Sequence, residues 1–381
     1  MHTNDILIDG ATANASVRGP IETKEFMRIV ELDGMRGFAI LLVVAAHYFG
    51  EVAHGLRWLA LGWAGVDMFF VLSGFLIGSI LLHNIGRKHY FRTFYIRRTF
   101  RIFPVYYIAL ALLFLLFLHG SDGLPVISYF TYTQNIMMAV SNHAGSSWLL
   151  PTWTLAVEEQ FYLLLPAVIY FVPRRLLPGV IIAAILSAPL LRSLFLAMGD
   201  MGSYVLLPCR WDLLFIGVCA AYLNQKPIDL VWVKTVLLGS ALIFVIAAVI
   251  SATYNPAVFD VVGELFVGLC FGAFLLLVVT GSPEGQRFRS RTLRFFGSIS
   301  YCLYLVHQPI AGIMHGYILG AQPDVANLQQ VLVSITAVVV SVCVATLSWI
   351  LLERPLIEFG HRWKYGGAQK ESPVGATIAA S

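Results

Sequence analysis

The chain has 381 residues, of which 58% are hydrophobic and 12% are charged, and its formal net charge at pH 7 is +4. Soluble domains rarely combine so large an apolar fraction with so few charges, so the composition predicts an integral membrane protein. The small net charge excludes a strongly basic nucleic-acid-binding protein. The five cysteines are widely spaced in apolar segments, so we expect neither a disulfide framework nor a metal site.

Ten segments are long and apolar enough to be membrane-spanning helices, which predicts an all-α polytopic bundle of about ten transmembrane helices. In chain order they are 34–51, 58–83, 102–118, 148–172, 179–197, 203–224, 233–252, 259–280, 295–318 and 328–352. The polar residues 1–30 lack the apolar core of a signal peptide, so we expect a disordered cytosolic tail there. Residues 361–381 are expected to form a second cytosolic tail, with one transmembrane domain over residues 31–360.

Positive charge alternates between the loops, which predicts the orientation of the chain. Loop 84–101 carries six lysines and arginines and loop 281–294 carries four, whereas the loops of the opposite side have only Arg57. Cytosolic loops carry such an excess of positive charge. Both termini are therefore expected in the cytosol, with the protein in the inner (plasma) membrane. The sequence gives no indication of the oligomeric state.

The first predicted helix contains the stretch LDGMRGFAILLVVAAHY, with Arg36 and His47 eleven residues apart. Eleven residues are almost three helical turns, so both side chains share one face, about 16 Å apart along the axis. Ionisable groups are costly in a bilayer, which makes this face a candidate lining of a reaction channel. The alternative is that Arg36 is an interfacial anchor and His47 a hydrogen-bonded core histidine.

The second predicted helix contains GVDMFFVLSGFLI, with Asp67 in an apolar setting. A short hairpin separates it from His47, so we expect the Asp67 carboxylate to accept a hydrogen bond from His47 and fix its tautomer. A structural ion pair or a helix cap is the alternative for Asp67. Ser73 and Gly74 are small residues that suit close helix packing.

The stretch FYIRRTFRIFPVYY carries Arg97, Arg98 and Arg101 at the start of the third predicted helix. Arg98 and Arg101 are three residues apart and share a helix face. Guanidinium groups bind phosphate in a bidentate geometry. Anionic lipid headgroups, topology signalling and a soluble phosphorylated cofactor such as coenzyme A all remain possible explanations of the cluster.

The fourth predicted helix contains PTWTLAVEEQFYLLLP, in which Glu158 and Tyr162 share a face. Glu158 and Glu159 are neighbouring carboxylates within the apolar segment and need partners, for which an arginine such as Arg210 is one candidate. Arg210 and Asp212, in CRWDLLFIG, are expected to pair with each other or with this fourth helix.

Two further polar stretches lie near the end of the chain. In GSISYCLYLVHQP, Ser300 and His307 are seven residues apart and lie roughly on one face, with Tyr301 next to Ser300. In LLERP, Glu353 and Arg354 are interpreted as anchors at the cytosolic interface.

Six of these stretches together resemble the membrane-bound acyltransferase 3 family of bacterial sugar and antibiotic O-acyltransferases. In the family's order they are LDGMRGFAILLVVAAHY, GVDMFFVLSGFLI, RRTFRIFPVYY, WTLAVEEQFY, GSISYCLYLVHQP and ERP, and they span roughly residues 31–360. Met35 and Thr154 depart from the family pattern, where Leu and Ser are common. Neither departure is expected to affect the chemistry.

The resemblance implies transfer of an acyl group, usually acetyl, from cytosolic acyl-CoA to a hydroxyl of a carbohydrate acceptor. Exopolysaccharide, O-antigen and lipid-linked sugar are the expected acceptor classes, with membrane lipids as surroundings. By the same resemblance His47 is the leading catalytic residue, Glu158 is the acidic residue of the fourth-helix motif, and Arg36, Arg98 and Arg101 belong to the CoA side.

Two other functions fit the same polar residues. Buried Asp, Glu, Arg and His side chains also occur in proton-coupled secondary transporters, although the chain shows no clear internal repeat. A non-catalytic subunit of a polysaccharide assembly complex is the second alternative. Loss of acyl transfer on replacing His47 would separate an enzyme from both.

Overall fold

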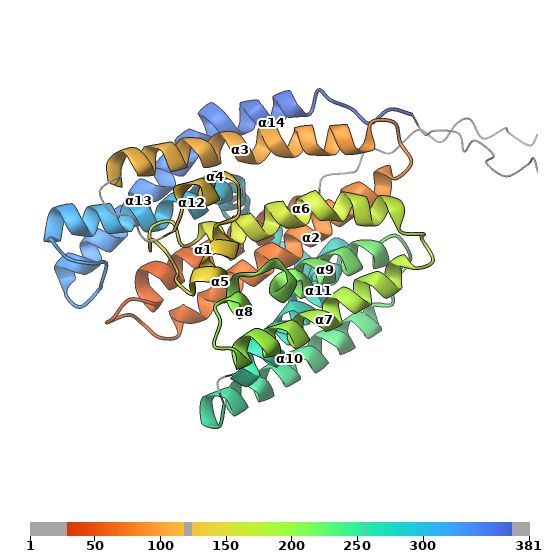
Figure 1. Ribbon diagram of the computed structural model, residues 1–381, viewed down its shortest axis with the longest axis horizontal. Helices are drawn as coiled ribbons and strands as arrows, with labels where there is room; N and C mark the ends of the chain where they lie inside the picture. Colours follow the sequence, from red (N-terminus) through yellow and green to blue (C-terminus); the bar gives the residue numbers. More distant parts are fainter. Residues whose placement is uncertain (1–28, 118–123, 256, 368–381) are drawn as a thin grey trace, which may run out of the picture.

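The computed structural model describes residues 29–117, 124–255 and 257–367, and within them the regular secondary structure is entirely helical. The predicted tails 1–30 and 361–381 lie mostly outside the described residues. Short helical turns connect the main elements (Figure 1). The helices are α1 Val30–Ala45, α2 Ala64–Asn84, α3 Tyr90–Phe117, α4 Val126–Phe130, α5 Gln134–Ser141, α6 Thr152–Phe171, α7 Leu177–Ala197, α8 Gly202–Val205, α9 Leu207–Leu223, α10 Leu230–Thr253, α11 Glu264–Val279, α12 Arg291–Leu319, α13 Leu328–Ser348 and α14 Arg354–Gly360.

Among the described residues, nine helical stretches are long and apolar enough to cross a membrane, and they correspond to nine of the ten predicted spans. The tenth predicted span, 295–318, forms most of the 29-residue helix α12 but is less apolar. Its polar side chains Ser300, His307 and His315 are buried in the bundle, where α1 and α13 pack beside α12. The prediction of a polytopic helical membrane protein is therefore confirmed, and α12 is its polar inner helix.

The third helix begins at Tyr90, twelve residues before the predicted start at residue 102. The arginines 97, 98 and 101 therefore project from a continuous helix and not from a loop. This matters for the pocket described below, since a helix holds Arg98 and Arg101 on one face.

Two glycine contacts set the spacing of the inner helices. A Cβ atom at Gly297 of α12 would lie 1.8 Å from the carbonyl oxygen of Asp33 in α1, and a Cβ at Gly74 of α2 would lie 1.9 Å from that of Leu214 in α9. Both helix pairs pack so closely that only hydrogen fits at these positions. The interpretation of Gly74 as a packing residue is confirmed.

Replacing Gly297 by alanine is expected to lower the stability of the bundle by about 1–3 kcal/mol, because the new methyl group must push α1 and α12 apart. Gly316→Ala is the matched control on the same helix, since no atom lies within 4 Å of its Cβ position. Thermal unfolding of the purified protein in detergent measures both. Equal unfolding temperatures for the two variants would contradict this packing.

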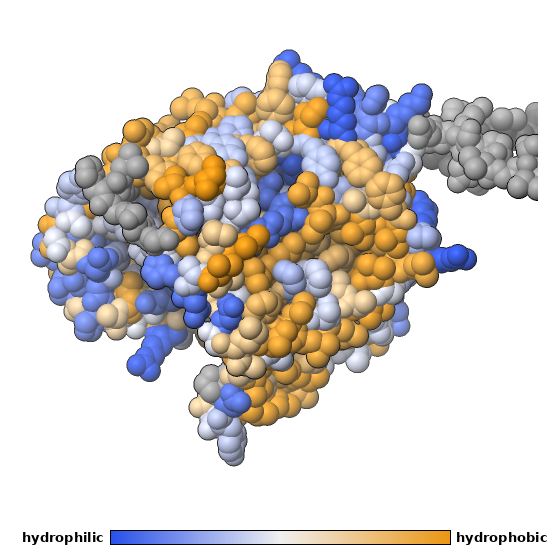
Figure 2. All heavy atoms as spheres, viewed as in Figure 1, coloured by the Kyte–Doolittle hydropathy of each residue, from blue (hydrophilic) through white to orange (hydrophobic). Residues whose placement is uncertain are grey.

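The outer helices show which surface faces lipid. In Figure 1, α3 and α14 run side by side along one edge of the bundle, while α7 and α10 form the opposite edge. The surface over α7 and α10 is mainly apolar in Figure 2, and exposed Leu186, Leu190, Leu238 and Leu242 contribute to it. Figure 2 also shows hydrophilic atoms in a hollow between α3 and α6.

Candidate active site

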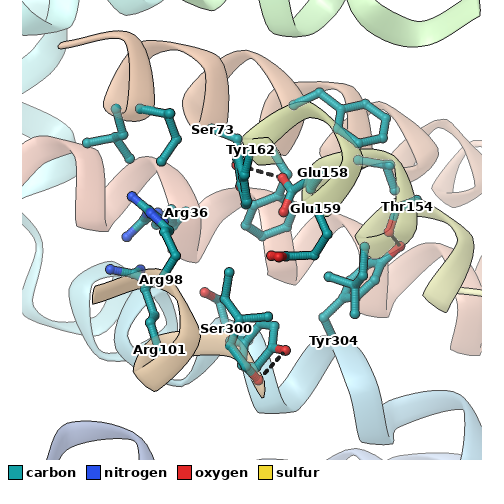
Figure 3. Close-up of a pocket in the computed structure, with 18 residues that line it drawn as sticks. Arg36, Ser73, Arg98, Arg101, Thr154, Glu158, Glu159, Tyr162, Ser300 and Tyr304 are labelled. Atoms are coloured by element: carbon teal, nitrogen blue, oxygen red, sulfur yellow. Dashed lines mark hydrogen bonds between the residues drawn. The ribbon is translucent and has the colours of Figure 1, made fainter. Parts of the chain in front are cut away.

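An open pocket lies among α1, α2, α3, α6 and α12. Eighteen residues line it (Figure 3). Apolar side chains such as Phe69 and Leu76 form part of the wall, and the polar ones gather in two groups. One group is made of arginines and the other of carboxyl and hydroxyl groups.

The arginine group consists of Arg36 from α1 and Arg98 and Arg101 from α3, which meet at one end of the pocket in Figure 3. Within the described residues none of the three forms a salt bridge with a carboxylate. The Arg98 guanidinium lies 5.3 Å from the centroid of the Tyr162 ring. Three neighbouring guanidinium groups repel one another, so this end of the pocket favours a multiply charged anion such as phosphate.

The carboxyl and hydroxyl group is centred on α6. The Ser73 hydroxyl donates to Glu158 Oε1 at 2.6 Å and lies 2.8 Å from the Tyr162 hydroxyl. Glu159 also lines the pocket, as does Thr154, whose hydroxyl lies 2.9 Å from that of Tyr304. Ser73, which the sequence suggested as a packing residue, also has a polar role, because its hydroxyl orients Glu158. Thr154, expected to be remote from the chemistry, is part of the pocket wall.

His47 lies outside the lining of this pocket, beside a second histidine. It belongs to a π-helix, Ala46–Gly50, that continues α1, and π-helical turns often occur at functional sites. Its Nδ1 is 2.7 Å from Nε2 of His307, the two rings are stacked with centroids 5.0 Å apart, and its Nε2 is 3.5 Å from Glu51 Oε2. His307 in turn lies 5.8 Å, ring to ring, from Tyr304 of the pocket wall.

The expected hydrogen bond between Asp67 and His47 is not formed. Asp67 Oδ1 lies 3.9 Å from Arg210 Nη1, deep between α2 and α9, and the structural ion pair that was its alternative describes it better. The hairpin between His47 and Asp67 contains an additional 3₁₀-helix, Leu59–Trp63, which changes how the two side chains face each other.

Arg210 and Asp212 were expected to pair with each other or with α6, but among the described residues they form no salt bridge of either kind. Arg210 contacts α6 through the Trp153 ring, whose centroid lies 5.5 Å from its guanidinium. Arg210 Nη1 lies 2.6 Å from Glu264 Oε2 in α11, and Asp212 Oδ2 accepts from Arg192 Nη2 of α7 at 2.8 Å. Arg192 and Glu264 were missed in the sequence analysis. Their signal was present, since Arg192 is the one charge in the predicted span 179–197 and Glu264 lies inside the predicted span 259–280, and a buried charge requires a partner.

Replacing Arg192 by leucine is expected to destabilise the protein by about 3–5 kcal/mol, because Asp212 is then left buried without its cation. The double variant Arg192→Leu, Asp212→Leu removes both charges and is expected to recover much of that loss. Thermal unfolding of both variants in detergent checks this. If the double variant were no more stable than Arg192→Leu, the unpaired Asp212 charge would not be the cause of the lost stability.

Arg97 does not belong to the pocket, although it is adjacent to Arg98. Its Nε donates to the carbonyl oxygen of Trp363 at 2.9 Å, and its guanidinium lies 5.3 Å from the Tyr365 ring centroid. It therefore holds the segment after α14, and its predicted role in cofactor binding is wrong. One residue further along, the helix turns Arg98 into the pocket.

The remaining predicted residues divide between pocket and core. Ser300 and Tyr301 line the pocket, and the Tyr301 hydroxyl donates to the Ile102 carbonyl at 3.0 Å. Glu353 is only 3% exposed and accepts from the Ser348 hydroxyl at 3.1 Å. Its interpretation as an interfacial anchor was wrong, because the chain turns it inward through a π-helix, Trp349–Glu353, while Arg354 pairs with Glu358 outside.

The acyltransferase 3 family, described as an acyltransferase domain, matches residues 29–353. The O-acetyltransferase OatA of Staphylococcus aureus strain MRSA252 is 26% identical over 407 aligned residues, covering 94% of this chain and 63% of the relative. The peptidoglycan O-acetyltransferase OatA of Listeria monocytogenes is 29% identical over 390 residues, covering 92% of this chain and 60% of the relative.

YrhL of Bacillus subtilis, named as a putative peptidoglycan O-acetyltransferase, is 28% identical over 377 residues. The alignment covers 90% of this chain and 57% of YrhL. The chain therefore spans roughly three fifths of the length of these relatives. No solved structure matches. The match over residues 29–353 includes every helix of the arginine pocket and both stacked histidines, and the protein belongs to the acyltransferase 3 family of multi-pass membrane proteins.

Proposed function

We propose that the protein is a membrane O-acyltransferase that moves an acetyl group from acetyl-CoA to a hydroxyl of a cell-envelope carbohydrate. The observation that carries the proposal is the pocket itself. Three arginines that form no salt bridge among the described residues stand at one end, and the hydrogen-bonded Glu158 stands in the same cavity.

The arginine end suits the phosphates of coenzyme A. Guanidinium groups provide bidentate donors for phosphate oxygens, and phosphates do not enter hydrocarbon. The excess of positive charge in loops 84–101 and 281–294 supports a cytosolic position for this end and for both termini, including the tails 1–30 and 361–381. The pantetheine arm then extends into the pocket toward Tyr304 and the histidines.

Transfer to a hydroxyl needs a base, because a neutral hydroxyl is a poor nucleophile. His47 is the proposed base: its side chain is 18% exposed and its Nε2 faces Glu51 at the far end of the first helix from Arg36. The acceptor hydroxyl loses its proton to His47 while its oxygen bonds to the thioester carbonyl carbon. The carbon–sulfur bond breaks, and the CoA sulfur takes the proton, which gives an ester and free CoA.

The acceptor class follows the relatives, two of which are named as peptidoglycan O-acetyltransferases. We therefore place peptidoglycan first among the carbohydrate acceptors, ahead of exopolysaccharide, O-antigen and lipid-linked sugar. The test compares O-acetyl groups on each purified envelope glycan from cells with and without the gene. Loss of O-acetyl from one glycan identifies the acceptor, and unchanged O-acetylation of all of them contradicts the proposal.

A further inference from the structure

We infer that His307 is a positioning residue that fixes the tautomer of His47 and so makes Nε2 of His47 the atom that takes the acceptor's proton. The inference rests on the proposed function, in which His47 is the base. It assigns to a second histidine the task that a carboxylate performs in many hydrolase triads.

The main chain of α12 determines which nitrogen of His307 carries the proton. His307 Nδ1 lies 3.1 Å from the carbonyl oxygen of Leu303, one helical turn earlier. A carbonyl oxygen only accepts hydrogen bonds, so this nitrogen must carry the proton. His307 is fully buried, and its ring forms no hydrogen bond with a carboxylate among the described residues. A buried imidazolium without such a partner is costly, so His307 is neutral and its Nε2 is bare.

The bare Nε2 of His307 is 2.7 Å from Nδ1 of His47. At that distance one of the two nitrogens must donate, and only His47 is left to do so. In its neutral form the His47 ring therefore carries its one N–H proton on Nδ1 and has a free lone pair on Nε2. The opposite assignment would direct the lone pair of His307 Nδ1 at the Leu303 carbonyl, which is repulsive.

Two contacts hold this arrangement in place. The Tyr48 hydroxyl donates to the main-chain oxygen of His307 at 2.7 Å and lies 3.0 Å from Ser341 Oγ of α13. Tyr48 follows His47 in the same π-helix, so its two contacts hold the turn that carries His47 against α12, which carries His307, and against α13. On the other side, Glu51 Oε2 is 3.5 Å from His47 Nε2. The bare nitrogen of the neutral ring has no proton to donate to this carboxylate, but the carboxylate is near enough to stabilise the imidazolium once Nε2 is protonated.

The test uses three variants of the full chain. They separate the effect of the hydrogen-bond acceptor at the position of His307 Nε2 from the effect of side-chain size. In His307→Gln the side-chain oxygen reaches the place of Nε2 and accepts from His47, whereas the shorter side chain of His307→Asn does not, and His307→Leu has no acceptor. We expect His307→Gln to keep kcat near that of the wild type. For His307→Asn and His307→Leu we expect kcat to fall by at least about 100-fold, with KM for acetyl-CoA unchanged.

Nitrogen-15 NMR of histidine-labelled protein in nanodiscs reads the tautomer directly, with His47 assigned by its loss in His47→Gln. The expected result is a proton on Nδ1 of His47 in the wild type and in His307→Gln, and a mixture of tautomers in His307→Asn. A proton on Nε2 in the wild type, or equal kcat for the glutamine and asparagine variants, overturns the inference. If no form transfers acetyl groups, the proposed function fails, and the wild-type spectrum alone decides the tautomer.

Discussion

Replacing His47 by glutamine is expected to abolish acyl transfer while leaving the protein folded. Glutamine is a neutral side chain of similar size that fills the space beside His307, but it cannot accept a proton from a hydroxyl. Removing a general base commonly lowers the rate by about 10²–10⁴-fold, so kcat is expected to fall into that range or below detection. Release of free CoA thiol from acetyl-CoA, measured with purified protein and acceptor-bearing membranes, gives the rate.

His54→Gln is the matched control, since this histidine lies in the connection between α1 and α2 but is exposed and pairs with Asp324 at 2.7 Å. The hydrogen bonds of the His54 backbone and ring hold the pKa of the Asp324 carboxyl below its usual value. That pair lies away from the arginine pocket, so its loss is expected to leave kcat unchanged. A His47→Gln protein with the activity of the His54→Gln control would remove His47 from the chemistry.

The second large effect is expected at the arginine end of the pocket. In the double variant Arg98→Ala, Arg101→Ala, binding of acetyl-CoA is expected to weaken by on the order of 100-fold or more, since each charge-assisted hydrogen bond to phosphate contributes about 1.5–3 kcal/mol. The loss should appear in Kd and KM and much less in kcat. Isothermal titration with CoA in detergent measures the affinity.

Arg92→Ala removes one positive charge from the same helix at an exposed position outside the pocket lining. It controls for the general effect of charge near the membrane surface, and its affinity for CoA is expected to match the wild type. The ratio between the Kd of the double variant and that of the wild type is expected to be smaller for dephospho-CoA than for CoA. It is expected to be smallest for pantetheine, which has no phosphate. An unchanged Kd in the double variant would leave these arginines with a role in topology or lipid contact only.

The sequence was sufficient to predict the membrane-spanning helices and several of the polar residues that line the pocket. Apolar length predicted the spans, and the three-residue spacing of Arg98 and Arg101 predicted a shared face, because both features depend on local geometry. The family resemblance grouped Arg36, Arg98 and Glu158 as site residues, and the structure brings the three into one cavity.

The charge partners were not predictable in the same way. Asp67, Arg210 and Asp212 each find a partner on a helix far away in the sequence, and which helices are neighbours depends on close contacts such as those at Gly74 and Gly297. The prediction that Arg36 and His47 share a face also assumes a regular α-helix with 3.6 residues per turn. The π-helix at Ala46–Gly50 breaks that assumption at His47, which explains why His47 faces His307 and not the pocket lined by Arg36.

The central claim is that this chain transfers an acetyl group from acetyl-CoA by means of His47 and the arginine pocket. The most direct measurement uses the purified full chain in liposomes that contain envelope glycan, with radiolabelled acetyl-CoA, and follows label in the glycan together with free CoA. The account predicts equal amounts of both products for the wild type and neither product for His47→Gln. Label that accumulates in the glycan at the same rate with His47→Gln, or no label in the glycan with the wild type, would contradict it.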